Sequence, residues 1–294
     1  MYTRDHQIHY RSLVPPLSTP MRQIVSAGRD GWTLQTASWV NSAVGLLASV
    51  AAKEPAVLAL LERQAPILDL GRCPERPSDD AHFAFLGGSI YAASSHVGYL
   101  LYCANALGHE GAHVVRRHEQ LPGDGSLERL LTRAQWEDEA HTDELRLHDK
   151  FDVYFRRLRS ELTVDASPWH REIQHYRTNA LRRRAYFRGR AAIVRVAQLL
   201  AEVAHLDTSV EHPPQSQLFA LGGQLVRELL EIHPTAQVMV EAHAATERTL
   251  EGYHIPPSLP QHAQLTEQLK VWRSESSRFL QLENQRTAAF TFLH

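Results

Sequence analysis

The chain has 294 residues and a formal net charge of −2, which excludes a strongly basic protein that binds nucleic acid or an anionic membrane through its overall charge. Hydrophobic residues make up 43% of the sequence, enough for a large globular core, and this excludes a disordered chain. The two cysteines, Cys73 and Cys103, are too few for a disulfide framework and do not have the CxxC spacing of a zinc site, so they favour a reducing compartment.

Residues 1–30 are predicted to form an extended N-terminal arm, because the prolines of LVPPLSTP are incompatible with a helix. This part of the sequence lacks the apolar stretch of a secretory signal. The most apolar windows, Val40–Ala52 and Ile90–Leu107, are too short or too polar to span a bilayer. The sequence therefore predicts a cytoplasmic protein that has no membrane partner.

From Trp32 onward, apolar residues recur every three or four positions, which is the period of an amphipathic helix. Pro55 is expected at the start of a second helix, because proline suits the first helical turn. A further helix is predicted around His96, over Ile90–Asn105, and the glycines of ALGHEGAH are expected to end it. Ser126 and Ser167 are the expected N-caps of two long helical segments.

The remaining helices are predicted at 216–231, after Pro234, and from about residue 261 to 290. Alternating patterns typical of strands are nearly absent, and no linker is long enough to demand two domains. The sequence therefore predicts an all-α fold in which residues 31–294 form a single domain of about eight to ten helices.

Two of the 18 histidines lie on helical faces of small or apolar residues. His96 shares its face with Tyr99, and burial there would favour the neutral ring that binds a metal or accepts a proton. His205 ends AAIVRVAQLLAEVAHL, beside small side chains that would let a flat macrocycle approach the helix. A hydrogen-bonded core histidine is the alternative for His96, and a histidine favoured by the helix dipole is the alternative for His205. His243 is a second choice of ligand.

Other polar clusters are interpreted as solvated faces. His109, His113 and His118 lie among arginines and glutamates. The segment WEDEAHTDELRLHD contains two i,i+4 pairs, Glu137/His141 and Glu144/His148, each of which could direct two metal ligands the same way. Helices with such alternating charge are usually exposed. Di-iron bundles use the ExxH spacing, and one such pair is Glu251–His254.

The run NALRRRAYFRGR places Arg184 and Arg188 one helical turn apart, beside aromatic residues. Paired N–H donors of this kind bind carboxylates, so these two arginines are candidate substrate ligands. A nucleic-acid site is the weaker interpretation, because the rest of the chain supplies no matching basic surface. Signatures of serine hydrolases, phosphate-binding loops and Rossmann domains are absent.

His96 in YAASSHVGYLLY and His205 in LLAEVAHL carry a resemblance to a known family. The chain resembles the haem-dependent aromatic oxygenases of the tryptophan dioxygenase superfamily, in particular the branch that hydroxylates tyrosine-like amino acids in natural-product pathways. The resemblance covers the organisation of residues 80–250. It implies haem b held by His205, His96 in the distal pocket over O₂ or peroxide, and an aromatic amino acid held by Arg184 or Arg188 with Tyr99 nearby.

Two other functions stay open. One is a non-haem di-iron oxygenase of helical-bundle type that uses Glu137 and His141. The other is a non-catalytic all-α binding protein in which every histidine is structural. A small aromatic substrate is the expected partner of the enzyme, nucleic acid is not expected, and a homo-oligomer is compatible with the sequence.

Overall fold

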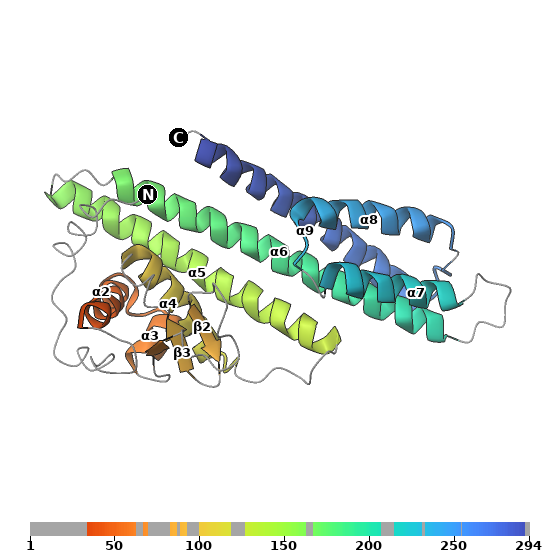
Figure 1. Cartoon of the computed structure of the whole chain (residues 1–294), viewed down its shortest axis with the longest axis horizontal. Coiled ribbons are helices and arrows are strands. Elements are labelled where there is room, and N and C mark those ends of the chain that lie inside the picture. Colours follow the sequence, from red (N-terminus) through yellow and green to blue (C-terminus); the bar gives the residue numbers. More distant parts are fainter. Residues whose placement is uncertain are drawn as a thin grey trace. The chain divides into compact units, whose positions relative to one another are not determined.

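The computed structural model describes residues 34–62, 67–69, 83–86, 89–92, 100–118, 127–162, 167–206, 215–230, 233–253 and 255–291. Eight α-helices and one π-helical segment dominate this part of the chain, which confirms the predicted helical class (Figure 1). The helices are α2 (Leu34–Ala51), α3 (Pro55–Leu61), α4 (Leu100–Val115), α5 (Leu127–Leu162), α6 (Ser167–His205), α7 (Gln215–Leu225), η3 (Val226–Leu230), α8 (Ala236–Glu251) and α9 (Pro260–Thr291).

Local sequence explains where several helices begin. Pro55 is at the first position of α3, as predicted, because its missing N–H is not needed there. α6 begins at Ser167, next to Pro168, and α5 begins directly after Ser126. Thr235 caps α8, and its hydroxyl accepts a hydrogen bond from the Val238 backbone N–H. None of the helices in the described residues is both long and apolar enough to cross a membrane.

A small sheet corrects one prediction. β1 (Ile67–Asp69), β2 (Phe83–Leu86) and β3 (Ser89–Ala92) form a sheet in the order β1-β3-β2, where β3 pairs parallel with β1 and antiparallel with β2. The helix predicted over 90–105 is therefore wrong at both ends, since Ile90–Ala92 belong to β3 and α4 runs from Leu100 past both glycines of ALGHEGAH to Val115. The physical reason is in FAFLGGSIYA, where two short aromatic and β-branched runs flank Gly-Gly, the signal of a two-residue hairpin.

Some predictions fall outside the described residues. These are the extended arm at residues 1–30 and the positions of His96 and Tyr99.

The chain divides into two compact units. Unit 1 comprises Met1–Gln120 and Glu139–Arg177, and unit 2 comprises Leu121–Asp138 and Thr178–His294. α5 and α6 each contribute residues to both units. The single domain predicted for residues 31–294 stays a prediction, because these two helices are shared.

The core of unit 1 is formed by apolar residues of α2, α3 and α4 with residues of α5 and α6, and Leu47, Leu107 and Phe151 are fully buried in it. α3 and α4 approach closely at Gly111. A Cβ atom at this position would lie 2.3 Å from the backbone oxygen of Ala56 on α3. Glycine therefore permits the contact that fixes α4 in the core.

The core of unit 2 contains Trp272 of α9, which is fully buried, together with Ile193 of α6 and Met239 of α8. The Trp272 indole Nε1–H donates a hydrogen bond to the Met239 carbonyl at 3.1 Å. This bond satisfies the polar atom of a large buried ring, as buried tryptophans require.

Candidate metal centre

Two lines of polar residues meet inside unit 1. On α4, Asn105, His109 and His113 follow one another at intervals of four residues and so share one helical face. On α5, His141, Glu144 and His148 also share a face, at intervals of three and four. Hydrogen bonds from Asn105 and His109 to Glu144 join the two lines.

Glu144 is the centre of the cluster. Its Oε2 accepts hydrogen bonds from His141 Nδ1 at 2.6 Å and His109 Nδ1 at 3.2 Å, and its Oε1 accepts one from Asn105 Nδ2 at 2.6 Å. Burial raises the pKa of the carboxyl group, but the hydrogen bonds from His109 and His141 outweigh it and hold this pKa well below its usual range. Glu144 is therefore an ionised, buried carboxylate.

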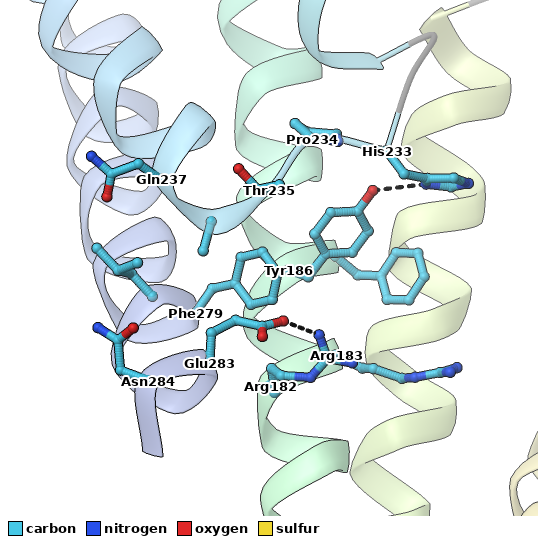
Figure 2. Close-up of a pocket in the computed structure, with 13 residues that line it drawn as sticks. Arg182, Arg183, Tyr186, His233, Pro234, Thr235, Gln237, Phe279, Glu283 and Asn284 are labelled. Atoms are coloured by element: carbon cyan, nitrogen blue, oxygen red, sulfur yellow. Dashed lines mark hydrogen bonds and ion pairs between the residues drawn. The ribbon is translucent and has the colours of Figure 1, made fainter. Parts of the chain in front are cut away.

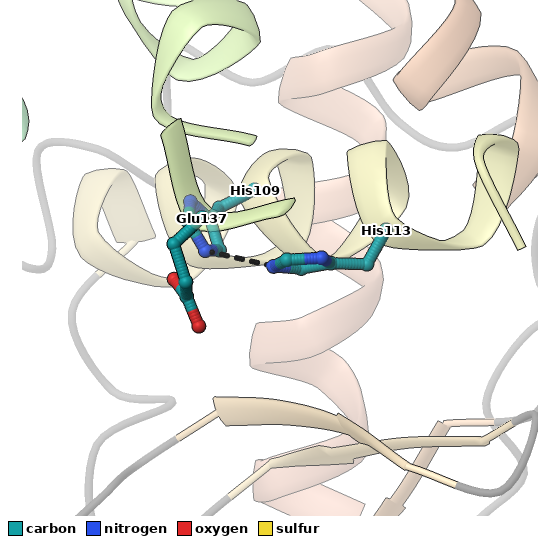
Figure 3. Close-up of side chains that lie close together, drawn as sticks. All are labelled: His109, His113 and Glu137. Atoms are coloured by element: carbon teal, nitrogen blue, oxygen red, sulfur yellow. Dashed lines mark hydrogen bonds between the residues drawn. The ribbon is translucent and has the colours of Figure 1, made fainter. Parts of the chain in front are cut away.

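A chain of histidines continues from His109 along α4. His109 Nε2 lies 3.2 Å from His113 Nε2, and Figure 3 shows these two rings facing each other. His113 Nδ1 lies 2.8 Å from His118 Nδ1, and His118 Nε2 lies 3.7 Å from Glu139 Oε2. Because Glu139 is half exposed, the chain links the buried carboxylate Glu144 to a carboxylate at the surface.

His148 lies on the other side of Glu144. Its Nε2 is 3.9 Å from Glu144 Oε1, and its side chain is 1% exposed. Among the described residues, neither ring nitrogen of His148 has a hydrogen-bond partner. Burial lowers the pKa of His148 to about 4, so the ring is neutral.

The interpretation of these clusters as solvated faces is wrong. His113, His118, His141, Glu144 and His148 are all less than 9% exposed. The exposed face of α5 is a different one, which carries Arg146 and Lys150. The alternating charges of α5 therefore indicate solvent exposure for only one of its faces. His141, Glu144 and His148 lie on another face, which is packed against α4.

The cluster has the composition of a metal site. One ligand atom each from His109, His141 and Glu144 lie within 4.8 Å of one another. Imidazole nitrogens suit iron, zinc, copper and nickel, and two histidines with one carboxylate are the ligand set of many non-haem Fe(II) sites. The sequence prediction paired Glu137 with His141 and Glu144 with His148, whereas the group inside unit 1 joins His141 to Glu144 and adds His109 from α4.

The predicted haem ligands lie in unit 2. His205 is exposed at the end of α6, and its ring centroid is 6.0 Å from that of Phe219. His243 is buried, its Nε2–H donates to the Leu269 carbonyl at 2.9 Å, and its ring packs edge-on against Trp272. The contacts of His243 are those of a hydrogen-bonded core histidine.

The predicted substrate arginines contact acidic residues of their own chain. Arg184 Nε donates to Asp138 Oδ1 at 2.7 Å, and Arg188 Nη1 pairs with Glu275 Oε1 at 2.9 Å. A nearby pocket in unit 2, with a volume of ≈ 670 Å³, is instead lined by Arg182 and Arg183 of the same run. Arg184 and Arg188 as substrate ligands stay a prediction, and the pocket is lined by their neighbours in the run.

Aromatic and polar groups line this pocket (Figure 2). The Tyr186 hydroxyl lies 2.9 Å from His233 Nδ1 and accepts a hydrogen bond from Arg190 Nη1 at 2.8 Å. Arg190 is buried and also donates to the carbonyl of Leu230, the last residue of η3. Arg182 forms an ion pair with Glu283. The side chains of Arg182 and Arg190 are thus held by interactions within the protein.

No protein-family model, no curated protein and no solved structure matches this chain. The resemblance to tryptophan dioxygenase, with His205 as haem ligand and His96 in a distal pocket, stays a prediction. The functional interpretation therefore depends on the geometry of the α4–α5 cluster.

Proposed function

We propose that this chain is a non-haem metalloenzyme in which His109, His141 and Glu144 bind a divalent first-row transition-metal ion. Fe(II) is the first candidate for this ion. The observation that carries the proposal is the convergence of two imidazole nitrogens, from buried His141 and partly buried His109, on one oxygen of a buried, ionised carboxylate. Carboxylates in protein interiors are costly unless they are paired or bind a metal.

The ligand set favours a catalytic ion over a purely structural one. Structural zinc sites use four protein ligands, whereas catalytic sites use about three and leave a position for water or substrate. An Fe(II) ion in a set of two histidines and one carboxylate supplies O₂ chemistry. His141 and Glu144 are buried, and the His109 side chain is 12% exposed, so the protein residues exclude bulk water from the ligand atoms.

The hydrogen bonds beyond His109 are compatible with a ligand role. If Nδ1 of His109 binds the ion, its proton is on Nε2 and is donated to His113 Nε2 at 3.2 Å. His113 Nδ1–H then donates to His118 Nδ1, and the N–H at His118 Nε2 faces the carboxylate of Glu139. Every ring in this sequence has one donor and one acceptor, as neutral imidazoles require. Outer partners of this kind fix the tautomer and orientation of metal-bound histidines.

The alternative is a hydrogen-bonded cluster that needs no metal. In that case His109 and His141 carry their protons on Nδ1, and both donate to Glu144. The same atoms serve either function, so metal binding itself is the decisive measurement.

The experiment uses the full chain after chelation and gel filtration, followed by titration with Fe(II) under anaerobic conditions and with Co(II) or Zn(II) in air. We expect tight binding that Glu144→Gln and His141→Gln each weaken by more than 100-fold, since each variant removes a direct ligand. His170→Gln is the control, because His170 is an exposed histidine of unit 1. Failure of the parent protein to bind any of the three ions above the level of nonspecific surface binding contradicts the proposal.

His113→Phe separates the outer partner from the ligands. This variant keeps the three proposed ligands and removes the acceptor for His109 Nε2–H. We expect metal affinity to fall by about 10- to 100-fold, as for other outer partners of metal-bound histidines. An unchanged affinity would show that the histidine chain does not support the site.

Haem binding through His205, with an aromatic amino acid as substrate, remains a separate proposal that rests on the family resemblance. An absorption spectrum distinguishes the two. A Soret band that His205→Ala abolishes supports haem, and bound iron without a Soret band supports the α4–α5 site.

A further inference from the structure

The two oxygens of Glu144 face different sets of nitrogen and oxygen atoms. His109 Nδ1 and His141 Nδ1 contact Oε2. His148 Nε2 and the Asn105 amide lie at Oε1, at 3.9 and 2.6 Å. A carboxylate with donors on both oxygens can bridge two metal ions, which in such sites lie about 3.5–4 Å apart.

His148 has no other role among the described residues. Both of its ring nitrogens are buried without a hydrogen-bond partner, although such groups in proteins are almost always hydrogen-bonded. Asn105 adds a third such atom, since its Oδ1 is also buried without a partner. Uncompensated polar groups of this kind are costly in a protein interior, and His148 Nε2 is one that lies near Oε1 of Glu144.

The spacing at Oε1 fits a metal ion better than a direct hydrogen bond. At 3.9 Å, His148 Nε2 and Glu144 Oε1 are too far apart for a hydrogen bond. Two ligands that each bind one ion at about 2.0–2.2 Å are separated by roughly 3–4 Å, depending on the angle between them.

We propose that His148, Glu144 Oε1 and Asn105 Oδ1 form a second divalent-metal site, so that Glu144 bridges two transition-metal ions. This inference rests on the proposed metal function of His109, His141 and Glu144, and it adds a second ion to that site. The chemical class of the ligand is again a first-row divalent cation, because the second set contains one imidazole and two oxygens. Rotation of the Asn105 amide brings Oδ1 to the side of Oε1 that Nδ2 now occupies.

The competing explanation is that His148 is only a core side chain. It predicts one ion per chain in the parent protein and the same number after His148 is replaced. His148→Leu is the test variant, because leucine fits an apolar interior and removes two unsatisfied polar atoms. His170→Leu is the matched control, since it removes an exposed histidine of the same unit.

The experiment loads the chelated full chain with Mn(II), removes free ion by gel filtration, and counts manganese per chain by mass spectrometry. Electron paramagnetic resonance then reports whether two ions interact. We expect two exchange-coupled ions per chain in the parent and in His170→Leu, and one uncoupled ion in His148→Leu. Circular dichroism verifies that His148→Leu is folded.

The outcomes separate the two proposals. One uncoupled ion in the parent overturns the second site and leaves the first intact, and no bound ion overturns both. Two ions that persist in His148→Leu overturn the assignment of His148. If His148→Leu fails to fold, the number and coupling of ions in the parent decide alone.

Discussion

Replacing Glu144 by glutamine keeps the size and shape of the side chain but removes its negative charge and replaces one acceptor oxygen by a donor. In the metal-free protein, the carboxylate accepts hydrogen bonds from Asn105, His109 and His141, all from atoms in the interior of unit 1. The amide of Glu144→Gln cannot accept from all three. Its NH₂ group must face either the two histidine donors or the Asn105 amide. We therefore expect the variant to be less stable than the parent.

The magnitude follows from the type of bond that is lost. A hydrogen bond to a charged group contributes about 1.5–3 kcal/mol and a neutral one about 0.5–1.5 kcal/mol, so the loss is about 1 kcal/mol for each bond. Three bonds give about 3 kcal/mol. The variant no longer buries a charge, which offsets part of this loss, because burial alone disfavours the ionised form of Glu144. The expected net change in the free energy of unfolding is about 2 kcal/mol.

Urea unfolding at neutral pH in the presence of a chelator, followed by circular dichroism, measures this change. Glu139→Gln is the control on the same helix. Glu139 is half exposed and pairs with Arg116 at 2.9 Å, and an exposed ion pair contributes only about 0–1 kcal/mol. If Glu144→Gln lowers the free energy of unfolding no more than Glu139→Gln does, the buried carboxylate does not hold α4 to α5 and the reasoning is refuted.

Three further predictions concern packing and burial. Gly111→Ala should destabilise the protein by about 1–3 kcal/mol, because the new methyl group meets backbone of α3. Gly108→Ala, whose methyl meets the side chains of Leu147 and Leu47 rather than backbone, should cost less in the same urea assay, because a side chain can shift more easily than backbone. Burial raises the pKa of Cys103 far above neutrality, so iodoacetamide at pH 8 should label its peptide only after unfolding, as read by mass spectrometry, and rapid native labelling would contradict the burial. Arg190→Met should cost about 1–3 kcal/mol because it leaves the Leu230 carbonyl without its donor, and a melting temperature equal to that of the parent would show that this bond contributes nothing.

The helical class was predictable because its signals are local. Apolar spacing predicts the helices, and Pro55 and Ser167 mark the starts of α3 and α6. The β2–β3 pair was missed although its signal is also local. Short aromatic and β-branched runs on either side of Gly-Gly predict a hairpin, but the apolar stretch after it favoured the interpretation of a continuous helix.

The candidate metal site was only partly predictable, because its proposed ligands come from two helices. His141 and Glu144 stand three residues apart in the order His-x-x-Glu, the reverse of the spacing sought in the sequence. The approach of His109 to Glu144 joins residues 35 apart, and no local pattern encodes it. Two signals in α4 were missed. Asn105, His109 and His113 lie on one face of the helix at intervals of four residues. Residues 109–113 also read HEGAH, an H-E-x-x-H sequence that is typical of metal-binding helices.

The discontinuous composition of the two units has a consequence for biosynthesis. Unit 1 requires the segment Glu139–Arg177, which follows Leu121–Asp138 of unit 2 in the chain. Chains emerge from the ribosome N-terminus first, so the imidazoles of α4 leave it before the carboxylate of α5 exists. The first unit can close only after Arg177 has emerged, and a nascent chain that stops near residue 120 would expose the partner face of α4 to chaperones.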